Sequence, residues 1–146
     1  PEITLRTTLI CGYPGETMQD FEEMKAWVEA TQFDRLGCFT YSHEEKTHAH
    51  SLVDDVTEEV KQQRVEDIMV IQQEISLTKN QEKVGKTFKV LIDKKEAGRY
   101  LARTEFDSVE VDNEVVINTN KKLIIGDFVQ VKITKAYDYD IEGEVV

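Results

Sequence analysis

The sequence predicts two structural parts, an α/β segment followed by an all-β barrel. In the first half, a β-prone run, an amphipathic helix and a second β-prone run follow one another. From Thr87 onward, apolar and polar residues alternate with the period of two that is typical of strands. The charge balance also changes: residues 1–81 carry 7 basic and 16 acidic side chains, whereas residues 82–146 carry 11 and 13. We therefore divide the chain into domains 1–81 and 82–146.

The first part is predicted to be a βαβ unit. Leu5–Cys11 is a β-prone run that ends in a cluster of turn-forming residues. Thr17 is expected to cap the helix that follows, with Asp20 completing a capping box. Leu36–Tyr41 forms the second strand, which should lie parallel to the first because a helix connects them.

A long second helix is expected from Thr57 to about Asn80. Its buried stripe consists of Val65, Ile68, Met69, Gln72 and Ile75. Two parallel strands do not make a stable sheet, because parallel sheets need both faces covered. We therefore expect companion strands before Pro1, and the absence of an initiator methionine also suggests a piece of a longer protein.

The second part is predicted to be a small antiparallel barrel of five short strands. Barrel closure protects the edges of strands in so small a domain. Apart from the strand that opens at Thr87, the candidates are Arg99–Arg103, Val115–Asn118, Val129–Thr134 and Tyr139–Val145.

Composition narrows the class of protein. The chain of 146 residues has a net charge of −11, which disfavours a general polyanion binder and favours a basic partner. It has neither a long apolar run nor a signal peptide, so we expect a cytoplasmic protein without a membrane partner. Cys11 and Cys38 each sit in an apolar run without metal-ligand spacing and are expected to be core residues.

Two linked segments resemble a known family. Thr7–Thr17 (TTLICGYPGET), with Phe33–Ser42 (FDRLGCFTYS), resembles the last strands of the radical S-adenosylmethionine barrel, a TIM-like fold, in methylthiotransferases. The second half, with Val84-Gly85-Lys86 and the run Leu123–Thr134, looks like their C-terminal TRAM domain, an OB-like barrel. The resemblance covers nearly the whole chain.

Within that family, Tyr41–Glu45 and the run Asp138–Glu144 resemble the RimO branch. This resemblance implies methylthiolation of an aspartate in a small-subunit ribosomal protein, the twelfth in the conventional naming. It also implies S-adenosylmethionine and two [4Fe-4S] clusters in the intact enzyme. The family's CxxxCxxC cluster motif is absent here, so the chain alone is expected to be inactive.

Further departures from the family lie in one loop. His43, Lys46 and His48 stand where relatives are expected to have Pro, Gly and Pro. The three histidines of this loop (His43, His48 and His50) suggest a metal site, but a solvated loop is the simpler interpretation.

The resemblance and the spacing together give candidate cofactor residues. Gly12 follows the first strand at the end where such barrels bind ligands, although it can equally be a turn residue. Arg6, Thr8 and Ile10 share one strand face, where Arg6 reaches either a carboxylate of the cofactor or solvent. Phe39 and Tyr41 either border the adenine or pack in the core.

Candidate substrate residues lie in the second part. The acidic run contains Glu110, Asp112 and Glu114, which either dock a basic ribosomal protein or form a solvated face. Tyr137 and Tyr139 are contact aromatics or core residues. Two other functions remain open: modification or binding of RNA, including transfer RNA, through the TRAM-like half, and a structural domain without a ligand.

Overall fold

The structure, a computed structural model, describes residues 3–109 and 112–146. It divides into two compact units, Pro1–Ile75 and Ser76–Val146, which we call the first unit and the barrel unit. The domain boundary drawn from the sequence, after residue 81, stays a prediction.

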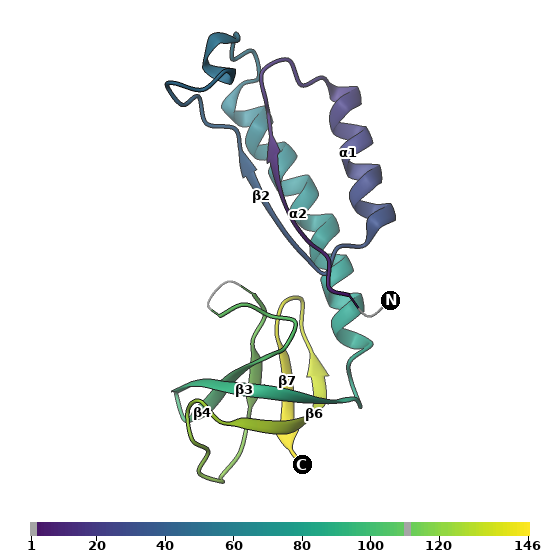
Figure 1. Cartoon of the computed structure of the whole chain (residues 1–146). Coiled ribbons are helices and arrows are strands. Elements are labelled where there is room, and N and C mark those ends of the chain that lie inside the picture. Colours follow the sequence, from purple (N-terminus) through teal and green to yellow (C-terminus); the bar gives the residue numbers. More distant parts are fainter. Residues whose placement is uncertain (1–2, 110–111) are drawn as a thin grey trace. The chain divides into compact units, whose positions relative to one another are not determined.

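The first unit begins with the predicted βαβ arrangement. Its elements are β1 (Arg6–Cys11), α1 (Met18–Thr31), β2 (Arg35–Thr40), the short 3-10 helix η1 (Ala49–Ser51) and the start of α2 (Glu58–Gln81). Thr17 caps α1 through a complete capping box with Asp20, as predicted. β1 and β2 are parallel, with Ile10 opposite Phe39 (Figure 1).

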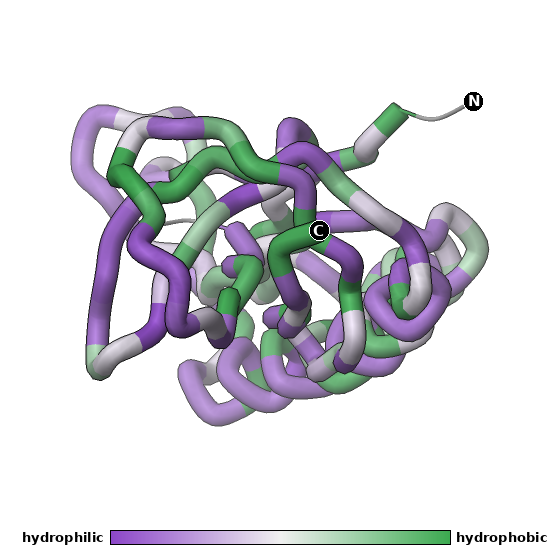
Figure 2. The backbone as a smooth tube through the Cα atoms, turned by 90° about the horizontal axis from the view of Figure 1, so that it is seen from below, coloured by the Kyte–Doolittle hydropathy of each residue, from purple (hydrophilic) through white to green (hydrophobic). Residues whose placement is uncertain are grey.

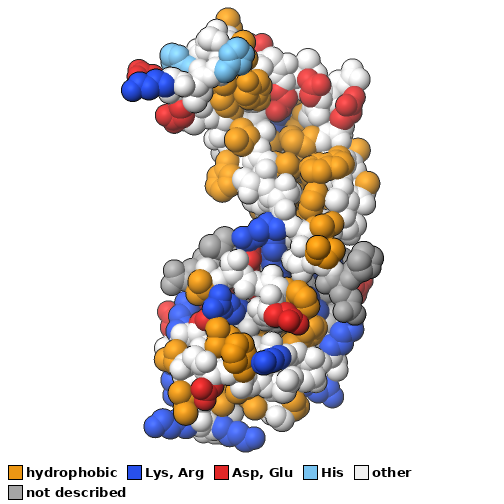
Figure 3. Space-filling view, viewed as in Figure 1, with side chains coloured by type: hydrophobic (Ala, Val, Ile, Leu, Met, Phe, Trp, Pro, Cys, Tyr) orange, Lys and Arg blue, Asp and Glu red, His pale blue; other side chains and the backbone are white. Residues whose placement is uncertain are grey.

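One face of this two-stranded sheet is covered by both helices. The buried cluster contains Cys11 and Cys38 from the strands, Phe21 and Val28 from α1, and Ile68 and Ile75 from α2, together with Phe33 and Leu36. Both cysteines are therefore core residues, as predicted. The opposite face of the sheet carries exposed side chains, and Figure 3 shows hydrophobic side chains at the surface of the first unit.

In the part of the barrel unit that the structure describes, five strands close into a ring in the order β3-β4-β5-β7-β6. They are β3 (Thr87–Glu96), β4 (Arg99–Thr104), β5 (Val115–Ile117), β6 (Phe128–Ala136) and β7 (Ile141–Val145). Their inward-facing residues form a core of Val90, Ile92, Tyr100, Ala102, Val115, Ile117, Val131, Ile133 and Ile141. Figure 2 shows hydrophobic and hydrophilic residues following one another along the strands.

The prediction that this barrel is antiparallel was wrong for one pair of strands. β5 and β7 are parallel, with Val115 opposite Ile141, whereas the other four pairs are antiparallel. The reason is topological, since strand directions cannot alternate all the way around a closed ring with an odd number of members. The barrel therefore has mixed strand orientation.

Candidate functional site

The loop after β1, residues 12–17, is held in place by its glycines and by carboxylates. We call it the Gly12 loop. Gly12 and Gly15 have φ of +82° and +85°, in the left-handed region that favours glycine. The Gly12 N–H donates to both carboxylate oxygens of Glu16 at 3.1 Å, and the Gly15 N–H donates to Oδ1 of Asp55 at 2.7 Å. These bonds order the loop at the carboxyl end of β1.

A buried lysine of α2 lies against Gly12. A Cβ at position 12 would lie 2.2 Å from Cγ of Lys61, whose side chain is 1% exposed. The Lys61 Nζ donates to Asp54 and Glu58, each at 2.9 Å. Burial acts to lower the pKa of Lys61, but these hydrogen bonds outweigh it and raise the pKa above its ordinary value. Lys61 therefore stays charged, and only glycine fits beside it.

A second cation of α2 holds the same loop. Arg64 Nη1 forms an ion pair with Glu16 Oε1 at 2.5 Å, and the two side chains are 8% and 11% exposed. Nη1 also donates to the main-chain oxygen of Glu16 at 3.2 Å. Since Glu16 accepts the Gly12 N–H, Arg64 orients the loop through Glu16.

The sequence reasoning did not identify Lys61 or Arg64. The usable signal was their spacing, because Lys61 lies four residues before Val65 and seven before Ile68 on the buried stripe of α2. A charged residue in line with a buried stripe needs a partner. Here the partners are Asp54 and Glu16 in the preceding loops and Glu58 in the first turn of α2.

Tyr41 lies just beyond β2 and is buried, whereas Phe39 is 61% exposed. The Tyr41 ring meets Tyr13 edge-on at 5.6 Å between centroids, and its hydroxyl lies 3.1 Å from Nδ1 of His43. Burial, and next the carboxylate of Asp54, raises the pKa of Tyr41. The two aromatics predicted to act together are thus in different surroundings, and Tyr41 packs beneath the Gly12 loop.

Four of the six predicted cofactor residues form the exposed face of the sheet. We call this set (Arg6, Thr8, Ile10 and Phe39) the open face. Ile10 is 56% exposed and pairs with Phe39 across the strands. The Phe39 ring leans over Gly37, where an added Cβ would lie 3.5 Å from its Cε2. Ile10 and Phe39 thus form an apolar surface beside the Gly12 loop.

Arg6 lies at the other end of this face. It pairs in register with Arg35 at the amino end of β1, four residues before Ile10. At a rise of about 3.3 Å per residue, the two Cα atoms are about 13 Å apart. The structure therefore does not bring Arg6 to the Gly12 loop.

Of the predicted substrate residues of the barrel unit, Asp112 and Glu114 line one pocket. Glu114 also lies against the segment before β7, because its N–H donates to Oδ1 of Asp140 at 3.0 Å. Glu110 lies outside the described residues. Asp112 accepts a hydrogen bond from the Ser108 N–H at 2.7 Å, and Glu114 lies 3.4 Å from Nζ of Lys94. This ion pair, mainly through the charge of Glu114, raises the pKa of Lys94.

Tyr137 and Tyr139 precede β7 and are 50% and 44% exposed, so the alternative that they face the core was wrong. The Tyr137 hydroxyl donates to Glu142 at 3.2 Å. Burial, and next the charge of Asp138, raises the pKa of Tyr139. Both aromatic rings are accessible to a partner.

Within residues 3–109 and 112–146, no three His, Cys, Asp or Glu side chains are grouped to hold a metal ion. His43 and His50 stack with centroids 4.4 Å apart, and all three histidines are exposed. No described helix is both long and apolar enough to cross a membrane.

Comparison with known proteins adds to this geometry. Residues 84–146 match the TRAM domain family. Together with the closed barrel of five strands, this match fits an OB-like β-barrel.

Three curated relatives carry the name ribosomal protein uS12 methylthiotransferase RimO. The chain is 55% identical to the protein of Christiangramia forsetii over 99% of the chain and 32% of that protein. It is 54% identical to the protein of Flavobacterium psychrophilum over 99% of the chain and 34% of that protein. It is 51% identical to the protein of Cytophaga hutchinsonii over 100% of the chain and 34% of that protein. The chain thus spans about a third of the length of the relatives it matches, and the resemblance found in its sequence is confirmed: it belongs to the RimO family, with a TRAM domain in its second half.

Proposed function

We propose that the chain is part of a radical S-adenosylmethionine methylthiotransferase that adds a methylthio group to an aspartate of ribosomal protein uS12. The observation that carries this proposal is an identity of 51–55%, over nearly the whole chain, to proteins named for uS12 methylthiolation. Since those proteins are about three times longer, the activity belongs to the intact enzyme.

The intact enzyme is expected to bind S-adenosylmethionine and two [4Fe-4S] clusters. The two thiols of this chain, Cys11 and Cys38, are buried with their Sγ atoms 3.4 Å apart, which does not fit cluster ligation. The Gly12 loop and the open face do fit one side of an adenosyl group, because they combine ordered backbone with an accessible apolar surface. When bound, S-adenosylmethionine supplies the radical chemistry.

In this proposal the first unit is the last part of the radical S-adenosylmethionine barrel. Ile10 and Phe39 border the adenine, and the backbone at Gly12 approaches the adenosyl group. Thr8 extends the same face. Arg6 contacts a carboxylate of the ligand only if the ligand lies along the strand. Tyr41, Lys61 and Arg64 position the Gly12 loop from beneath.

The test of this cofactor surface uses the intact enzyme with reconstituted clusters. Ile10→Asp should weaken binding of S-adenosylmethionine, measured by equilibrium dialysis, at least tenfold, because it places a charge against the adenine. Val70→Asp is a matched control, since Val70 is also 56% exposed but lies on α2. Equal affinities for the two variants would remove the open face from the cofactor site.

The barrel unit is proposed to recruit the protein substrate. Glu110, Asp112 and Glu114, with Tyr137 and Tyr139, are the contact residues expected from the sequence. The net charge of −11 supports a basic partner, and ribosomal proteins need basic surfaces to contact RNA. The competing function, RNA binding by the TRAM domain, predicts a steep dependence of affinity on salt with transfer RNA.

A titration of the chain with purified uS12 and with transfer RNA, at low and moderate salt, separates these two functions. Binding of uS12 with weak binding of transfer RNA supports the proposal. Tight, salt-sensitive binding of transfer RNA without binding of uS12 would replace it with the RNA-binding function.

A further inference from the structure

Two adjoining pockets lie on the outer surface of the barrel, and they share Arg103 as a wall. Their volumes are about 270 Å³ and about 150 Å³. We call the combined depression the Arg103 groove. Lysine and arginine side chains lie beside hydrophobic ones on the barrel surface in Figure 3.

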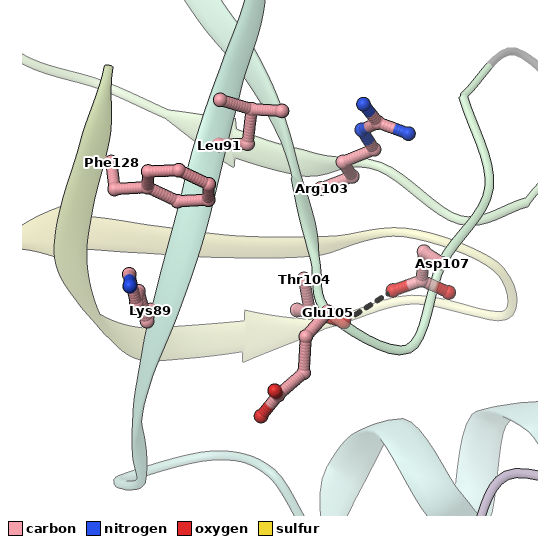
Figure 4. A pocket seen from close by; sticks show the side chains of 7 residues that line it. All are labelled: Lys89, Leu91, Arg103, Thr104, Glu105, Asp107 and Phe128. Carbon is pink, nitrogen blue, oxygen red and sulfur yellow. Dashed lines mark hydrogen bonds between the residues drawn. The ribbon is translucent and has the colours of Figure 1, made fainter. Parts of the chain in front are cut away.

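The register of the strands explains the floor of the larger pocket. Leu91 of β3 is opposite Phe128 of β6 on one side and Arg103 of β4 on the other. These three side chains therefore form a row across neighbouring strands, outside the barrel (Figure 4). Phe128 is 61% exposed, so the floor offers an accessible aromatic ring beside an aliphatic side chain.

The cations of the groove already have partners. Lys89 Nζ lies 4.5 Å from the centroid of the Phe128 ring, and Arg103 Nε lies 3.3 Å from Asp93. Lys94 is paired with Glu114. An incoming anion would have to disrupt these contacts.

Among the described residues, the carboxylates of the groove outnumber its cations, five to three, and they include Glu105 and Asp107 beside the apolar floor. Asp107 accepts a hydrogen bond from Thr104 at 2.7 Å, the dashed line in Figure 4. Glu105 is exposed and forms no ion pair with a described residue. A lysine or arginine entering the groove can lay its aliphatic stem on Leu91 and Phe128 and bring its charge to Glu105.

The smaller pocket contains a polar group without a partner. Asn113 is 9% exposed, and its Nδ2 has no hydrogen-bond acceptor among the described residues. A buried donor left unpaired is unfavourable, so an acceptor supplied by a ligand there is favoured. A main-chain carbonyl of an extended peptide provides such an acceptor.

From these observations we infer that the Arg103 groove binds an extended basic segment of the protein substrate, with one long cationic side chain on Leu91 and Phe128 and a main-chain carbonyl on Asn113. This inference rests on the proposed function and names a surface for it. A nucleic acid is disfavoured, because its phosphates would face five carboxylates and cations that are already paired.

The test measures the affinity of uS12 for the chain by calorimetry. A double variant, Glu105→Lys with Phe128→Ser, changes two exposed side chains and should weaken binding at least tenfold. Glu82→Lys, an exposed charge reversal away from the groove, should change affinity less than twofold. In an amide NMR spectrum, uS12 should shift the side-chain NH₂ signals of Asn113 in the parent chain and not in the double variant.

Other outcomes separate the groove from the proposed function. If uS12 binds the parent chain and the double variant equally, the groove is not the docking surface, and the proposed function stands. If the chain does not bind uS12 but the intact enzyme modifies it, the groove inference fails together with recruitment by the barrel unit, and only the methylthiotransferase activity stands. If the intact enzyme does not modify uS12, both fail. If RNA shifts the side-chain NH₂ signals of Asn113, and if Lys89→Ala abolishes RNA binding, the groove is an RNA-binding site instead.

Discussion

Replacing Gly12 with alanine tests how tightly the loop at the end of β1 is fitted to α2. The new methyl group would lie 2.2 Å from Cγ and 2.9 Å from Cδ of Lys61. Lys61 is 1% exposed and is held by Asp54 and Glu58, so it cannot move aside without losing hydrogen bonds. We expect Gly12→Ala to destabilise the first unit.

Two contributions set the size of the effect. A residue with a Cβ costs about 1–2 kcal/mol at a positive φ such as the +82° of Gly12. Inserting a methyl group into a filled site costs about 1–3 kcal/mol more. The free energy of unfolding should therefore fall by about 2–5 kcal/mol. Gly15→Ala is the matched control, because φ is +85° but nothing lies within 4 Å of its Cβ, so only the first contribution applies.

Urea unfolding followed by tryptophan fluorescence is the suitable assay. Trp27 is the single tryptophan of the chain, and it lies on α1 in the first unit, 4.9 Å from Phe33 between ring centroids. In a Lys61→Ala background, Gly12→Ala should lose the packing contribution, giving a coupling of about 1–3 kcal/mol in the double-mutant cycle. Equal losses for Gly12→Ala and Gly15→Ala, or no coupling to Lys61, would refute the reasoning.

Three further predictions concern other parts of the chain. Thr17→Ala should lower the free energy of unfolding by about 1 kcal/mol through loss of the α1 cap. Because hydrogen bonds from Thr17 lower the pKa of Asp20, their stabilisation should be complete above the ordinary pKa of 3.8 and lost as the pH falls through the lowered value. Urea unfolding at several pH values, with Asp20→Asn for comparison, measures this dependence. The Sγ atoms of Cys11 and Cys38 are 3.4 Å apart, so diamide should take two electrons and two protons from the two thiols and leave an intramolecular disulfide. Intact-mass analysis detects this disulfide as the loss of two hydrogens, and Cys11→Ser should abolish that loss. Gly143→Ala would place a Cβ 2.5 Å from Cγ1 of Val131 and 2.6 Å from the main-chain oxygen of Lys132. It should therefore destabilise the barrel by about 1–3 kcal/mol, as measured by thermal unfolding followed by circular dichroism. Gly98→Ala is the control, because nothing lies within 4 Å of its Cβ and this clash is absent.

The elements of the first unit were predictable because their signals are local. The capping box at Thr17 and the alternation along β1 depend on residues close in sequence, and both agree with the structure. The roles of Lys61 and Arg64 were not predictable in the same way. Their partners, Asp54 and Glu16, are identified only once the loops fold back onto α2.

In the barrel, alternation located the strands but not their pairing. β5 has only three residues, and its orientation relative to β7 depends on closure of the ring. The candidate substrate residues show the same limit, since the composition favours a basic partner but does not distinguish Glu114, which is paired with Lys94, from Glu105, which is exposed. Charge content is therefore a weaker guide to a site than charge pairing.

The short strand β5 has a consequence for how the barrel avoids self-association. Without its three residues, the remaining order β4-β3-β6-β7 is an open antiparallel sheet with two unpaired edges. β5 covers both edges at once, through Tyr100–Ala102 on β4 and Ile141–Gly143 on β7. Its partners on β7 are 26 residues away in sequence, so this seam forms through long-range closure, and it should open before the hairpins do. If β5 separates from β4 and β7, two strand edges become unpaired and can form hydrogen bonds with other chains. Pairing of β5 with both neighbours therefore protects the barrel against aggregation.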